Sequence, residues 1–398
     1  MIDVIGFHHR DLLPPFCLKI IQEARVLVGG RRHLASFPEF EGPKIELQSP
    51  LEKALEKLKE FSSQRVALLA SGDPLFFGIG KRLLSLFPPE KLRFHPAPTA
   101  FQLAFARAQI PWEEARIISF HGREAWRNLH LEIAPYGVVA FLTDPLNTPS
   151  RIASYLLEKG LEGQAVVCEN LALPEERIFQ LPLEAVAEKE FAPLNVFILR
   201  KSPAPRRFVF GLPEENFARE GGLITKDFLR SQIIAALSPF REAVVWDLGA
   251  GSGAVGLELA SICFKGEAYL VEKSPSRLSL IEKNLKRFKL DNVHIVPRPL
   301  EVALEALPPP DLVFIGGGFQ ALYQKKETFL SKVKSSTRIC ATFVCLENLI
   351  RALELFEKEG FRTKFDLFSV SRGKRLANGA YMLAAENPVF LLKAWRER

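Results

Sequence analysis

Glycines and acidic residues near the middle of the chain have the spacing of a nucleoside-binding turn. The run VVWDLGAGSGAVGLELA places three alternating glycines after an apolar segment, and the next apolar run, AYLVE, ends in a glutamate. Glycines at a strand-to-helix turn let the backbone approach a ligand closely. An acidic residue roughly 20 positions further on is suited to binding a ribose hydroxyl pair. The predicted contact residues are Asp247, Gly249, Ala250, Gly251, Ser252, Gly253 and Glu272.

The identity of the nucleoside depends on Asp247. Proteins that bind nicotinamide, flavin or S-adenosylmethionine share such a turn. A carboxylate before the glycines would repel a pyrophosphate but attract the ammonium group of S-adenosylmethionine. The run DLVFIGGG would form the floor of a methyltransferase pocket, and FRTKFDLFSV and YMLAA would form the terminal hairpin of its sheet. The alternative is that the glycines only pack a strand against a helix and that Glu272 is a surface charge.

A second candidate turn lies in the run RVALLASGDPLFFGIG. An apolar segment ends at Gly72, Asp73 and Pro74, and a helical pattern follows. Gly72 allows close approach of a ligand, and proline is favoured in the first turn of a helix. A turn with a helix cap explains the same residues equally well.

The elements around both turns alternate short apolar runs with helical patterns over all 398 residues. Continuous apolar runs separated by helices predict buried, largely parallel sheets. The segment KSPAPRR holds two prolines and little to bury, so we place a domain boundary there, between residues 1–203 and 204–398. The fold class is α/β with two domains. The segment LEKALEKLKEF predicts an amphipathic helix with a solvated charged face.

Composition limits the protein class. Hydrophobic residues make up 47% and charged residues 25%, which is a globular composition, and no apolar run is long enough to span a bilayer. The five cysteines form no CxxC pair, so we expect buried reduced thiols in a cytoplasmic protein without a metal site. The net charge of +7 lies wholly in residues 202–398, and a basic half attracts nucleic acid or a polycarboxylate.

The second half resembles the decarboxylating methyltransferase domain of cobalamin biosynthesis. The resemblance rests on Ile224-Thr225-Lys226, on the Gly249–Gly253 loop and on the run PDLVFIGG at residues 310–317. It implies a seven-stranded Rossmann-like fold that binds S-adenosylmethionine. The implied cofactor contacts are Thr225, Gly249 to Gly253, Glu272 and Leu300, and the implied substrate contacts are Gly316, Gly317 and Gly318. Where many relatives have an acidic residue near the adenine, this chain has Pro297-Arg298-Pro299-Leu300.

The first half resembles the tetrapyrrole methylase family, most closely its C5-methylating cobalamin branch. The similarity runs through SGDP, HPAPTAFQLAFARAQIPW, ISFHGR, FLTDPLNTP and VCENLALPEERI. It implies a two-lobed fold that binds S-adenosylmethionine in a cleft. The implied donor contacts are Gly72, Asp73, Pro74, Thr99 and Ala100, with Thr143, Asp144 and Asn170 on the same cleft. Arg123 would bind a substrate carboxylate, and His121 beside it either joins this contact or lies in an exposed turn.

The amino-terminal loop departs from that family. Relatives usually carry a G-x-G-x-G loop after the first strand, whereas Gly6 is followed here by Phe7-His8-His9-Arg10. Since this loop faces the substrate in relatives, its substrate contacts are open. A metal role for His8 and His9 would need a third ligand, and no such residue is evident.

Together the two resemblances imply methylation of a precorrin-6-type tetrapyrrole at C5 and C15, with decarboxylation of the C12 acetate. Methyl transfer needs mainly alignment, which is consistent with the lack of a Ser/His/Asp or Cys/His constellation. The basic loop of Arg372, Lys374 and Arg375 either binds substrate carboxylates or is a solvated turn. We expect a homo-oligomer that binds neither nucleic acid nor membrane. The alternatives are a nucleic-acid methyltransferase, although the expected [DN]-P-P-[YF] tetrapeptide is missing, and a non-enzymatic tetrapyrrole carrier.

Overall fold

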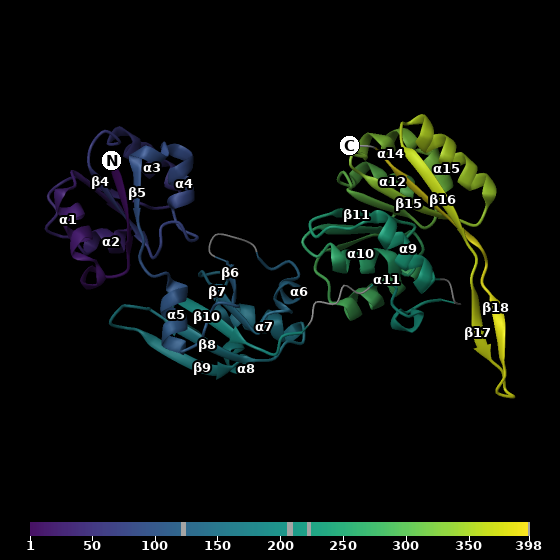
Figure 1. Cartoon of the computed structure of the whole chain (residues 1–398), viewed down its shortest axis with the longest axis horizontal. Coiled ribbons are helices and arrows are strands. Elements are labelled where there is room, and N and C mark those ends of the chain that lie inside the picture. The colour runs from purple at the N-terminus through teal and green to yellow at the C-terminus, as the bar shows by residue number, and fades with distance from the viewer. Residues whose placement is uncertain (121–124, 205–209, 221–223, 397–398) are drawn as a thin grey trace. The chain divides into compact units, whose positions relative to one another are not determined.

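The computed structural model, drawn in Figure 1, describes residues 1–120, 125–204, 210–220 and 224–396. The chain forms two compact units, Met1–Ala125 with Ile133–Pro205 and Trp126–Glu132 with Arg206–Arg398. The second unit thus includes a short segment taken from the middle of the first half. Asn128 fixes this segment: its Nδ2 donates to the carbonyl of Phe264 (3.0 Å) and its Oδ1 accepts from the backbone N–H of Asp291 (2.8 Å).

The first unit begins with a parallel five-stranded sheet in the order β3-β2-β4-β1-β5. Its strands are β1 (Ile2–Phe7), β2 (Val26–Gly29), β3 (Lys44–Glu46), β4 (Val66–Ser71) and β5 (Leu92–His95). Its helices are α1 (Pro15–Glu23), α2 (Arg31–Ala35), α3 (Leu51–Glu60) and α4 (Gly80–Leu86), with short 3₁₀ turns at Arg10–Leu12 and Pro89–Lys91. Leu68 and Leu69 of β4 enter different core clusters, one on each face of the sheet, so an unbroken apolar run is buried.

A second five-stranded sheet completes the first unit, in the order β6-β7-β10-β8-β9. Its strands are β6 (Arg116–Ser119), β7 (Val138–Leu142), β8 (Gln164–Glu169), β9 (Arg177–Pro182) and β10 (Asn195–Arg200). Its helices are α5 (Ala100–Ala108), α6 (Leu129–Ile133), α7 (Pro149–Glu158) and α8 (Leu183–Ala187). Only the β6–β7 pair is parallel, so the prediction of largely parallel sheets is wrong for this lobe. The short connection from β8 to β9 accounts for one of the antiparallel pairs, because antiparallel neighbours need no crossover helix, and β10 enters between β7 and β8 antiparallel to both.

The second unit contains a seven-stranded sheet in the order β13-β12-β11-β14-β15-β19-β16. Its strands are β11 (Val244–Leu248), β12 (Glu267–Val271), β13 (Val293–Val296), β14 (Leu312–Ile315), β15 (Arg338–Phe343), β16 (Arg362–Phe368) and β19 (Val389–Trp395). Its helices are α9 (Asp227–Leu237), α10 (Ala254–Ile262), α11 (Pro275–Phe288), α12 (Leu300–Ala306), α13 (Phe319–Gln324), α14 (Lys326–Lys332) and α15 (Leu346–Lys358), after a 3₁₀ turn at Glu214–Asn216. The first five strands of that order are parallel, and β19 is antiparallel to both of its neighbours.

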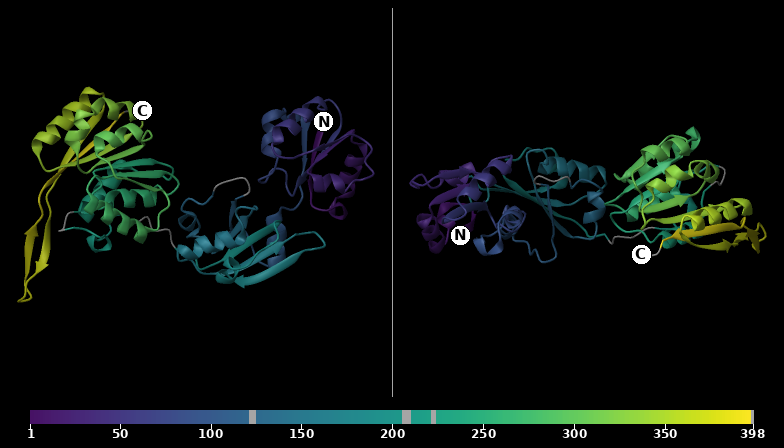
Figure 2. Two further views of the ribbon diagram at one scale, coloured as in Figure 1. Left: turned by 180° about the vertical axis from the view of Figure 1, so that it is seen from behind. Right: turned by 90° about the horizontal axis from the view of Figure 1, so that it is seen from above.

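The end of the chain differs from the sequence prediction. The segment YMLAA is β18 (Tyr381–Ala385), which pairs with β17 (Ser371–Arg375) in a separate two-stranded sheet. Figures 1 and 2 show this hairpin extending away from the body of the second unit. The strand that pairs with β16 in the seven-stranded sheet is β19, which lies between β15 and β16. An exposed apolar strand and a buried one have similar compositions, so the sequence pattern did not separate them.

All five cysteines are free thiols, and four of them are buried. Cys345 is exposed, which corrects the prediction that all five are buried. Cys345 lies between the end of β15 and the start of α15, outside the sheet. Among the described residues, no helix combines the length and apolarity needed to cross a bilayer.

Candidate functional site

The glycine loop of the second unit joins β11 to α10 and is folded onto the end of β12. Gly249, Gly251 and Gly253 have φ values of +74°, +59° and +77°, a region that favours glycine. The N–H groups of Gly249 and Ala250 both donate to the carbonyl of Val271 at 3.0 Å. A side chain at Gly251 would enter open space, since a Cβ at this position would have no atom within 4 Å. The loop therefore presents a bare backbone surface.

Glu272 follows β12 directly and is only 5% exposed. Its Oε2 accepts from the N–H of Gly251 (2.9 Å), and its Oε1 accepts from the N–H groups of Lys273 and Ser274, both at 2.9 Å. A carboxylate has about four acceptor positions. Glu272 therefore holds the glycine loop in place and keeps capacity for a ribose hydroxyl, as the ribose prediction requires.

The predicted substrate glycines meet the same loop. Strand β14 is the parallel neighbour of β11, and the N–H groups of Gly316 and Gly317 donate to the carbonyl of Leu248 at 3.0 and 3.3 Å. A Cβ on Gly249 would lie 2.8 Å from the carbonyl oxygen of Gly317, so only glycine fits this crossing. Leu300 begins α12, and its Cδ2 would lie 3.6 Å from a Cβ on Gly318. The structure thus brings the ends of β11, β12 and β14 and the start of α12 together.

Asp247 lies beneath the loop and is 1% exposed. Its Oδ2 accepts from the N–H of Gly256 (2.8 Å), and its Oδ1 finds no hydrogen-bond partner among the described residues. The pKa of this carboxyl group is raised to about 7: burial is the main cause and the charge of Glu272 adds to it, while the Gly256 hydrogen bond acts in the opposite direction. A cationic ligand above the loop would relieve this unfavourable burial, which fits the proposed ammonium contact.

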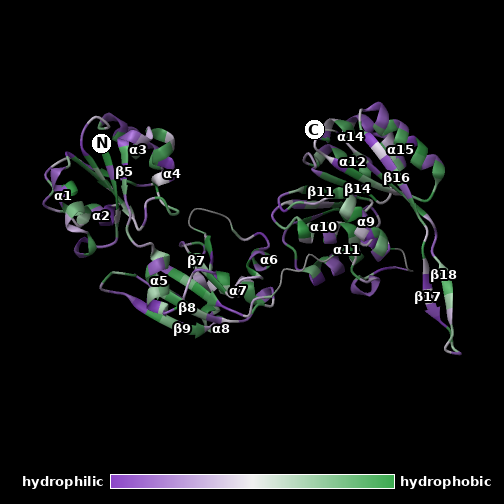
Figure 3. Cartoon of the chain, viewed as in Figure 1, coloured by the Kyte–Doolittle hydropathy of each residue, from purple (hydrophilic) through white to green (hydrophobic). Residues whose placement is uncertain are grey.

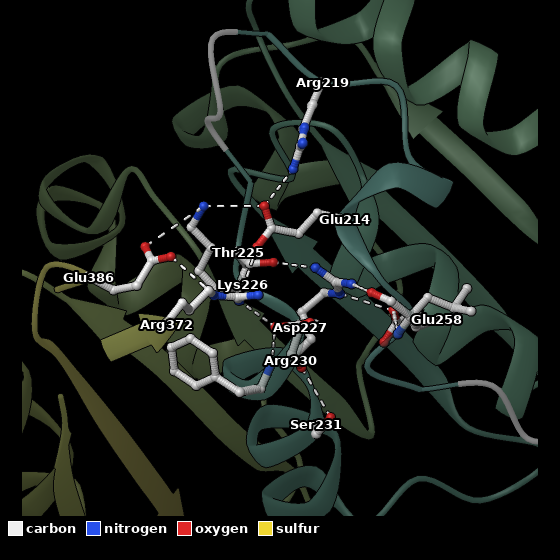
Figure 4. Close-up of polar contacts among 12 residues, drawn as sticks. Glu214, Arg219, Thr225, Lys226, Asp227, Arg230, Ser231, Glu258, Arg372 and Glu386 are labelled. Carbon is white, nitrogen blue, oxygen red and sulfur yellow. Dashed lines mark hydrogen bonds and ion pairs between the residues drawn. The ribbon is translucent and has the colours of Figure 1, made fainter. Parts of the chain in front are cut away.

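Thr225 is held near α10 by a fully buried ion pair, shown in Figure 4. Arg230 Nε donates to Glu258 Oε1 (2.9 Å), and the other nitrogens of the guanidinium donate to the carbonyls of Thr225 and Leu212. Glu258 also accepts from the N–H groups of Gly211 (2.7 Å) and Leu212 (3.0 Å). Since Glu258 belongs to α10, the pair ties the Thr225 segment to the helix that follows the glycine loop.

Asn284 is a second positioning residue that the sequence did not reveal. It is fully buried in α11, and its Nδ2 donates to the carbonyls of Ser252 (2.9 Å) and Ala218 (3.0 Å). Its Oδ1 accepts from the N–H of Ala218 (2.6 Å). One amide side chain thereby joins the glycine loop to the segment before Thr225. No local pattern distinguishes this asparagine from a surface one.

The arginine of the basic loop is partly exposed and is paired with carboxylates of its own chain. Arg372 of β17 donates to Asp227 (2.6 Å) and Glu214 (3.2 Å), and its Nε lies 3.2 Å from Glu386 (Figure 4). Glu214 also accepts from Lys226 at 3.2 Å. Arg372 therefore anchors the hairpin to the start of α9, and of the three basic residues only Lys374 and Arg375 stay exposed.

The SGDP turn of the first unit lies beside the start of α5. Gly72 has φ +62°, and a Cβ there would lie 3.5 Å from both the Pro98 carbonyl oxygen and the Thr99 Cα. Asp73 Oδ1 accepts from the N–H of Leu75 (2.8 Å) and shapes the turn before Pro74. Thr99 caps α5 reciprocally with Gln102, in bonds of 2.7 and 3.1 Å, and Ala100 is the first helical residue. The two predicted donor segments are neighbours.

The amino-terminal loop after β1, which differs from the family's glycine-rich pattern, packs against both the SGDP turn and the segment before α5. A Cβ on Gly6 would lie 2.4 Å from the Gly72 carbonyl oxygen and 2.6 Å from the Ala97 nitrogen. His8 Nε2 makes a 2.5 Å hydrogen bond to the Pro98 carbonyl. This histidine therefore braces the loop before Thr99. Among the described residues, no group of three or more His, Cys, Asp or Glu side chains could hold a metal ion.

The remaining predicted residues belong to the second lobe. Thr143 follows β7 and donates to Asn195 Oδ1 at 2.6 Å, and Asp144 Oδ1 accepts from the N–H groups of Leu146 and Asn147. Asn170 follows β8 and has φ +51°. These side chains shape turns within their own lobe. Arg123 and His121 lie outside the described residues, so their predicted substrate contact stays a prediction.

Comparisons with known proteins assign both halves. The family described as tetrapyrrole (corrin/porphyrin) methylases matches residues 5–187, and the precorrin methyltransferase domain matches residues 215–393. A Sinorhizobium protein named precorrin-6Y C(5,15)-methyltransferase (decarboxylating) is 30% identical over 305 residues, covering 75% of this chain and 74% of that protein. A Salmonella typhimurium cobalt-precorrin-7 C(5)-methyltransferase is 37% identical over 189 residues, 47% of this chain and 92% of its own length. A Pyrobaculum aerophilum protein named as a probable cobalt-precorrin-6B C(15)-methyltransferase (decarboxylating) is 31% identical over 189 residues. The match covers 46% of this chain and 95% of that protein.

The fold and both matches define a methyltransferase built from two methylase domains, of the class that uses S-adenosylmethionine. Both resemblances drawn from the sequence motifs are thereby confirmed. More specifically, the chain belongs to the precorrin-6Y C5,15-methyltransferase (decarboxylating) family. None of the three relatives is named for a nucleic-acid substrate, so the nucleic-acid alternative has no support.

Proposed function

We propose that this chain methylates a precorrin-6-type tetrapyrrole at C5 and C15 and removes the carboxyl group of the C12 acetate. We assign C5 methylation to residues 1–203 and the other two steps to residues 204–398. The observation that carries the proposal is the meeting of Gly249–Gly253, Glu272 and Gly316–Gly318 at one edge of the sheet, in a chain of this family.

S-adenosylmethionine, when bound, supplies a methyl group on a sulfonium that a carbon nucleophile can attack. The chain contributes alignment: Glu272 would bind the ribose, Asp247 would attract the ammonium group, and the Gly316 turn would limit where the acceptor carbon lies. Alignment of this kind lowers a barrier by roughly 7–11 kcal/mol. In the decarboxylation, the carbon–carboxylate bond breaks, carbon dioxide leaves, and the bond electrons enter the protonated ring. A proton then replaces the carboxyl group.

The test compares two glycines at which replacement by alanine would introduce a similar backbone strain. Gly251 and Gly360 both have positive φ values, +59° and +76°, and a Cβ at either position has nothing within 4 Å. Gly251→Ala would place a methyl group on the exposed surface of the glycine loop, whereas Gly360→Ala carries the same strain at the end of α15. Each substitution is expected to cost roughly 1–2 kcal/mol of stability, because an alanine Cβ crowds the following carbonyl oxygen in the left-handed region.

We expect calorimetric titration of the full-length protein with S-adenosylmethionine to show two sites, of which Gly251→Ala loses one and Gly360→Ala loses none. Mass spectrometry of the tetrapyrrole product should show C5 methylation alone in Gly251→Ala. Carbon dioxide release at the wild-type rate in that variant would refute the assignment of residues 204–398. A wild-type chain that transfers no methyl group to a tetrapyrrole would refute the function as a whole.

We also propose that the chain forms a homo-oligomer through the hairpin of β17 and β18. Tyr381 and Leu383 are each 74% exposed, and Leu383 lies opposite Gly373, which has no side chain to cover it. Figure 3 shows β17 as hydrophilic and β18 as partly hydrophobic. Light scattering should show a smaller assembly for Leu383→Lys than for the wild type. Phe240→Lys, at an exposed phenylalanine before β11, should leave the mass unchanged.

The place of action that we propose is the cytoplasm. The four buried thiols support this proposal, because free cysteines are typical of reducing compartments. Fractionation of the source cells would test it, with activity in the membrane pellet or outside the cell as the contrary result.

A further inference from the structure

The base of the β17–β18 hairpin carries two side chains of opposite charge. Arg372 belongs to β17, Glu386 follows β18, and the Nε of Arg372 lies 3.2 Å from the Glu386 carboxylate. The N–H of Glu386 donates to the carbonyl of Val370 (2.8 Å), which closes the base of the hairpin. Because the hairpin forms a two-stranded sheet of its own, side chains at its base can fix its direction.

Glu214 is the carboxylate around which further charges gather. It is 9% exposed, and it accepts from Arg219, from Lys226 (3.2 Å) and from Arg372 (3.2 Å). Three cations around one nearly buried carboxylate offset its loss of hydration. The charge cluster, drawn in Figure 4, holds three cations and three anions, namely Arg219, Lys226, Arg372, Glu214, Asp227 and Glu386. A network of this kind fixes geometry better than an isolated surface pair does.

Within this charge cluster, Arg372 contacts the first turn of α9. Its Nη2 donates to Asp227 Oδ1 (2.6 Å) as well as to Glu214, and its Cζ lies 5.7 Å from the centre of the Phe228 ring. Burial acts to raise the pKa of Asp227, but the hydrogen bonds from Arg372 and from the N–H of Phe228 hold it below its ordinary value. The ionised carboxylate therefore links β17 to the start of α9.

Thr225 lies directly before the residues that the charge cluster holds. The ammonium group of Lys226 donates to Glu214 (3.2 Å) and lies 3.9 Å from Glu386 of the hairpin base. The carbonyl of Thr225 itself accepts from the buried guanidinium of Arg230. Thr225 is thus held on one side by the ion pair to α10 and on the other by the base of the hairpin. A displacement of the hairpin base would move the residues that follow Thr225.

We propose that Arg372 is a positioning residue of the donor site in the second unit, acting through Asp227 and Glu214 to hold Thr225 in place. This proposal rests on the proposed function, in which Thr225 contacts S-adenosylmethionine. The charge of Arg372 is matched by carboxylates of its own chain. Arg372 therefore fixes the start of α9 and does not bind the carboxylates of the tetrapyrrole.

The experiment uses variants of the full-length protein. Arg372→Gln removes the charge, whereas Arg372→Lys keeps a charge but donates from a single nitrogen. The matched control is Arg351→Gln, at an exposed arginine of α15. Leu383→Lys leaves the charge cluster in place and changes the exposed strand of the same hairpin. Asp227→Asn, alone and combined with Arg372→Gln, tests whether the two residues act together.

Two measurements report on the donor. Calorimetry with S-adenosylmethionine gives the affinity of the second-unit site, which is the site that Gly251→Ala is expected to lose. Initial rates of C15 and C5 methylation by the same preparation give a donor KM for each unit. The first unit is therefore an internal control for general damage to the protein.

We expect Arg372→Gln to raise the donor Kd of the second-unit site and the donor KM for C15 methylation about ten-fold, which corresponds to about 1.4 kcal/mol. The kcat for C15 methylation at saturating donor and the donor KM for C5 methylation should be unchanged. Arg372→Lys should restore part of the lost affinity, and Arg351→Gln and Leu383→Lys should keep the wild-type affinity. Arg372→Gln combined with Asp227→Asn should bind the donor as Arg372→Gln alone does, because residues of one network are not additive.

The contrary results are distinct. Unchanged donor affinity in Arg372→Gln would show that the charge cluster only directs the hairpin, and an equal loss in Leu383→Lys would show that the effect depends on assembly. A lower kcat at constant donor affinity would assign Arg372 to the acceptor, and additive losses with Asp227→Asn would separate the two residues. Each of these results overturns the proposal. A wild-type chain that binds S-adenosylmethionine but methylates no tetrapyrrole refutes the proposed function, and the calorimetric comparison then still decides the role of Arg372.

Discussion

The buried pair Arg230–Glu258 ties the segments around Leu212 and Thr225 to α10, and Arg230→Met tests this anchor. Both side chains are fully buried, and the guanidinium of Arg230 donates hydrogen bonds to the Glu258 carboxylate and to two backbone carbonyls. Removal of the guanidinium leaves Glu258 charged and hydrogen-bonded only to the N–H groups of Gly211 and Leu212. A buried charge that loses its partner typically costs about 3–5 kcal/mol.

The loss should depend on pH in a defined direction. Burial already raises the pKa of Glu258, while the charge of Arg230 lowers it. Without Arg230 the pKa rises further. A carboxyl group whose pKa is raised by folding contributes its full stability below its unfolded value, near 4.5, and loses that stability as pH rises through the folded value. The deficit of Arg230→Met should therefore be larger at pH 7 than at pH 5.

Hydrogen exchange across a urea series, read by mass spectrometry at the amides of Gly211 and Leu212, measures this local free energy. The control is Arg241→Met, which breaks an exposed pair with Glu242 and should cost less than about 1 kcal/mol. The double variant Arg230→Met/Glu258→Gln should cost no more than Arg230→Met alone, because glutamine carries no charge and its amide oxygen can still accept from the N–H groups of Gly211 and Leu212. Additive losses, or a deficit that does not change between pH 5 and pH 7, would refute this account of the pair.

Three further outcomes are expected. Asp247→Asn should stabilise the protein by at most about 4 kcal/mol above pH 7, where the wild-type carboxylate is ionised against a pKa of about 7, and by little at pH 4; thermal unfolding at both pH values checks this. The same variant should bind S-adenosylmethionine more weakly at pH 8, and equal affinity in calorimetry would argue against the ammonium contact. Thr99→Ala should cost about 1 kcal/mol through loss of the α5 cap, and Thr99→Ser should restore most of it in the same unfolding measurement.

The sequence predicted the site best at positions where the backbone geometry allows only one residue type. The glycines of the Gly249 loop and the Gly316 turn are required by positive φ or by close approach, so their types report the geometry directly. The run VALLA predicted a buried strand because β4 is covered on both faces. The position of Glu272 after β12 followed from its separation from the glycines.

Long-range partners were invisible in the sequence. Arg230, Glu258 and Asn284 resemble ordinary surface residues of amphipathic helices, and only the fold shows that they are buried and bonded to distant backbone. The error at the C-terminus has a similar cause. Both YMLAA and VFLLKAW are short apolar runs, and only the pairing of β19 between β15 and β16 separates the buried strand from the exposed hairpin.

The hydrogen bonds of the glycine loop bear on which nucleoside it can hold. Sites for the pyrophosphate of a dinucleotide rely on backbone N–H groups that point at the phosphates. Here the N–H groups of Gly249 and Ala250 donate to Val271, that of Gly251 to Glu272, and that of Gly253 to the carbonyl of Ala250. A pyrophosphate would have to displace the Glu272 carboxylate and lie above the buried Asp247, with unfavourable repulsion from both. A cationic donor without phosphate meets an acidic site in which these four of the five N–H groups of the Gly249–Gly253 loop are already bonded, and this arrangement favours a sulfonium nucleoside over a dinucleotide.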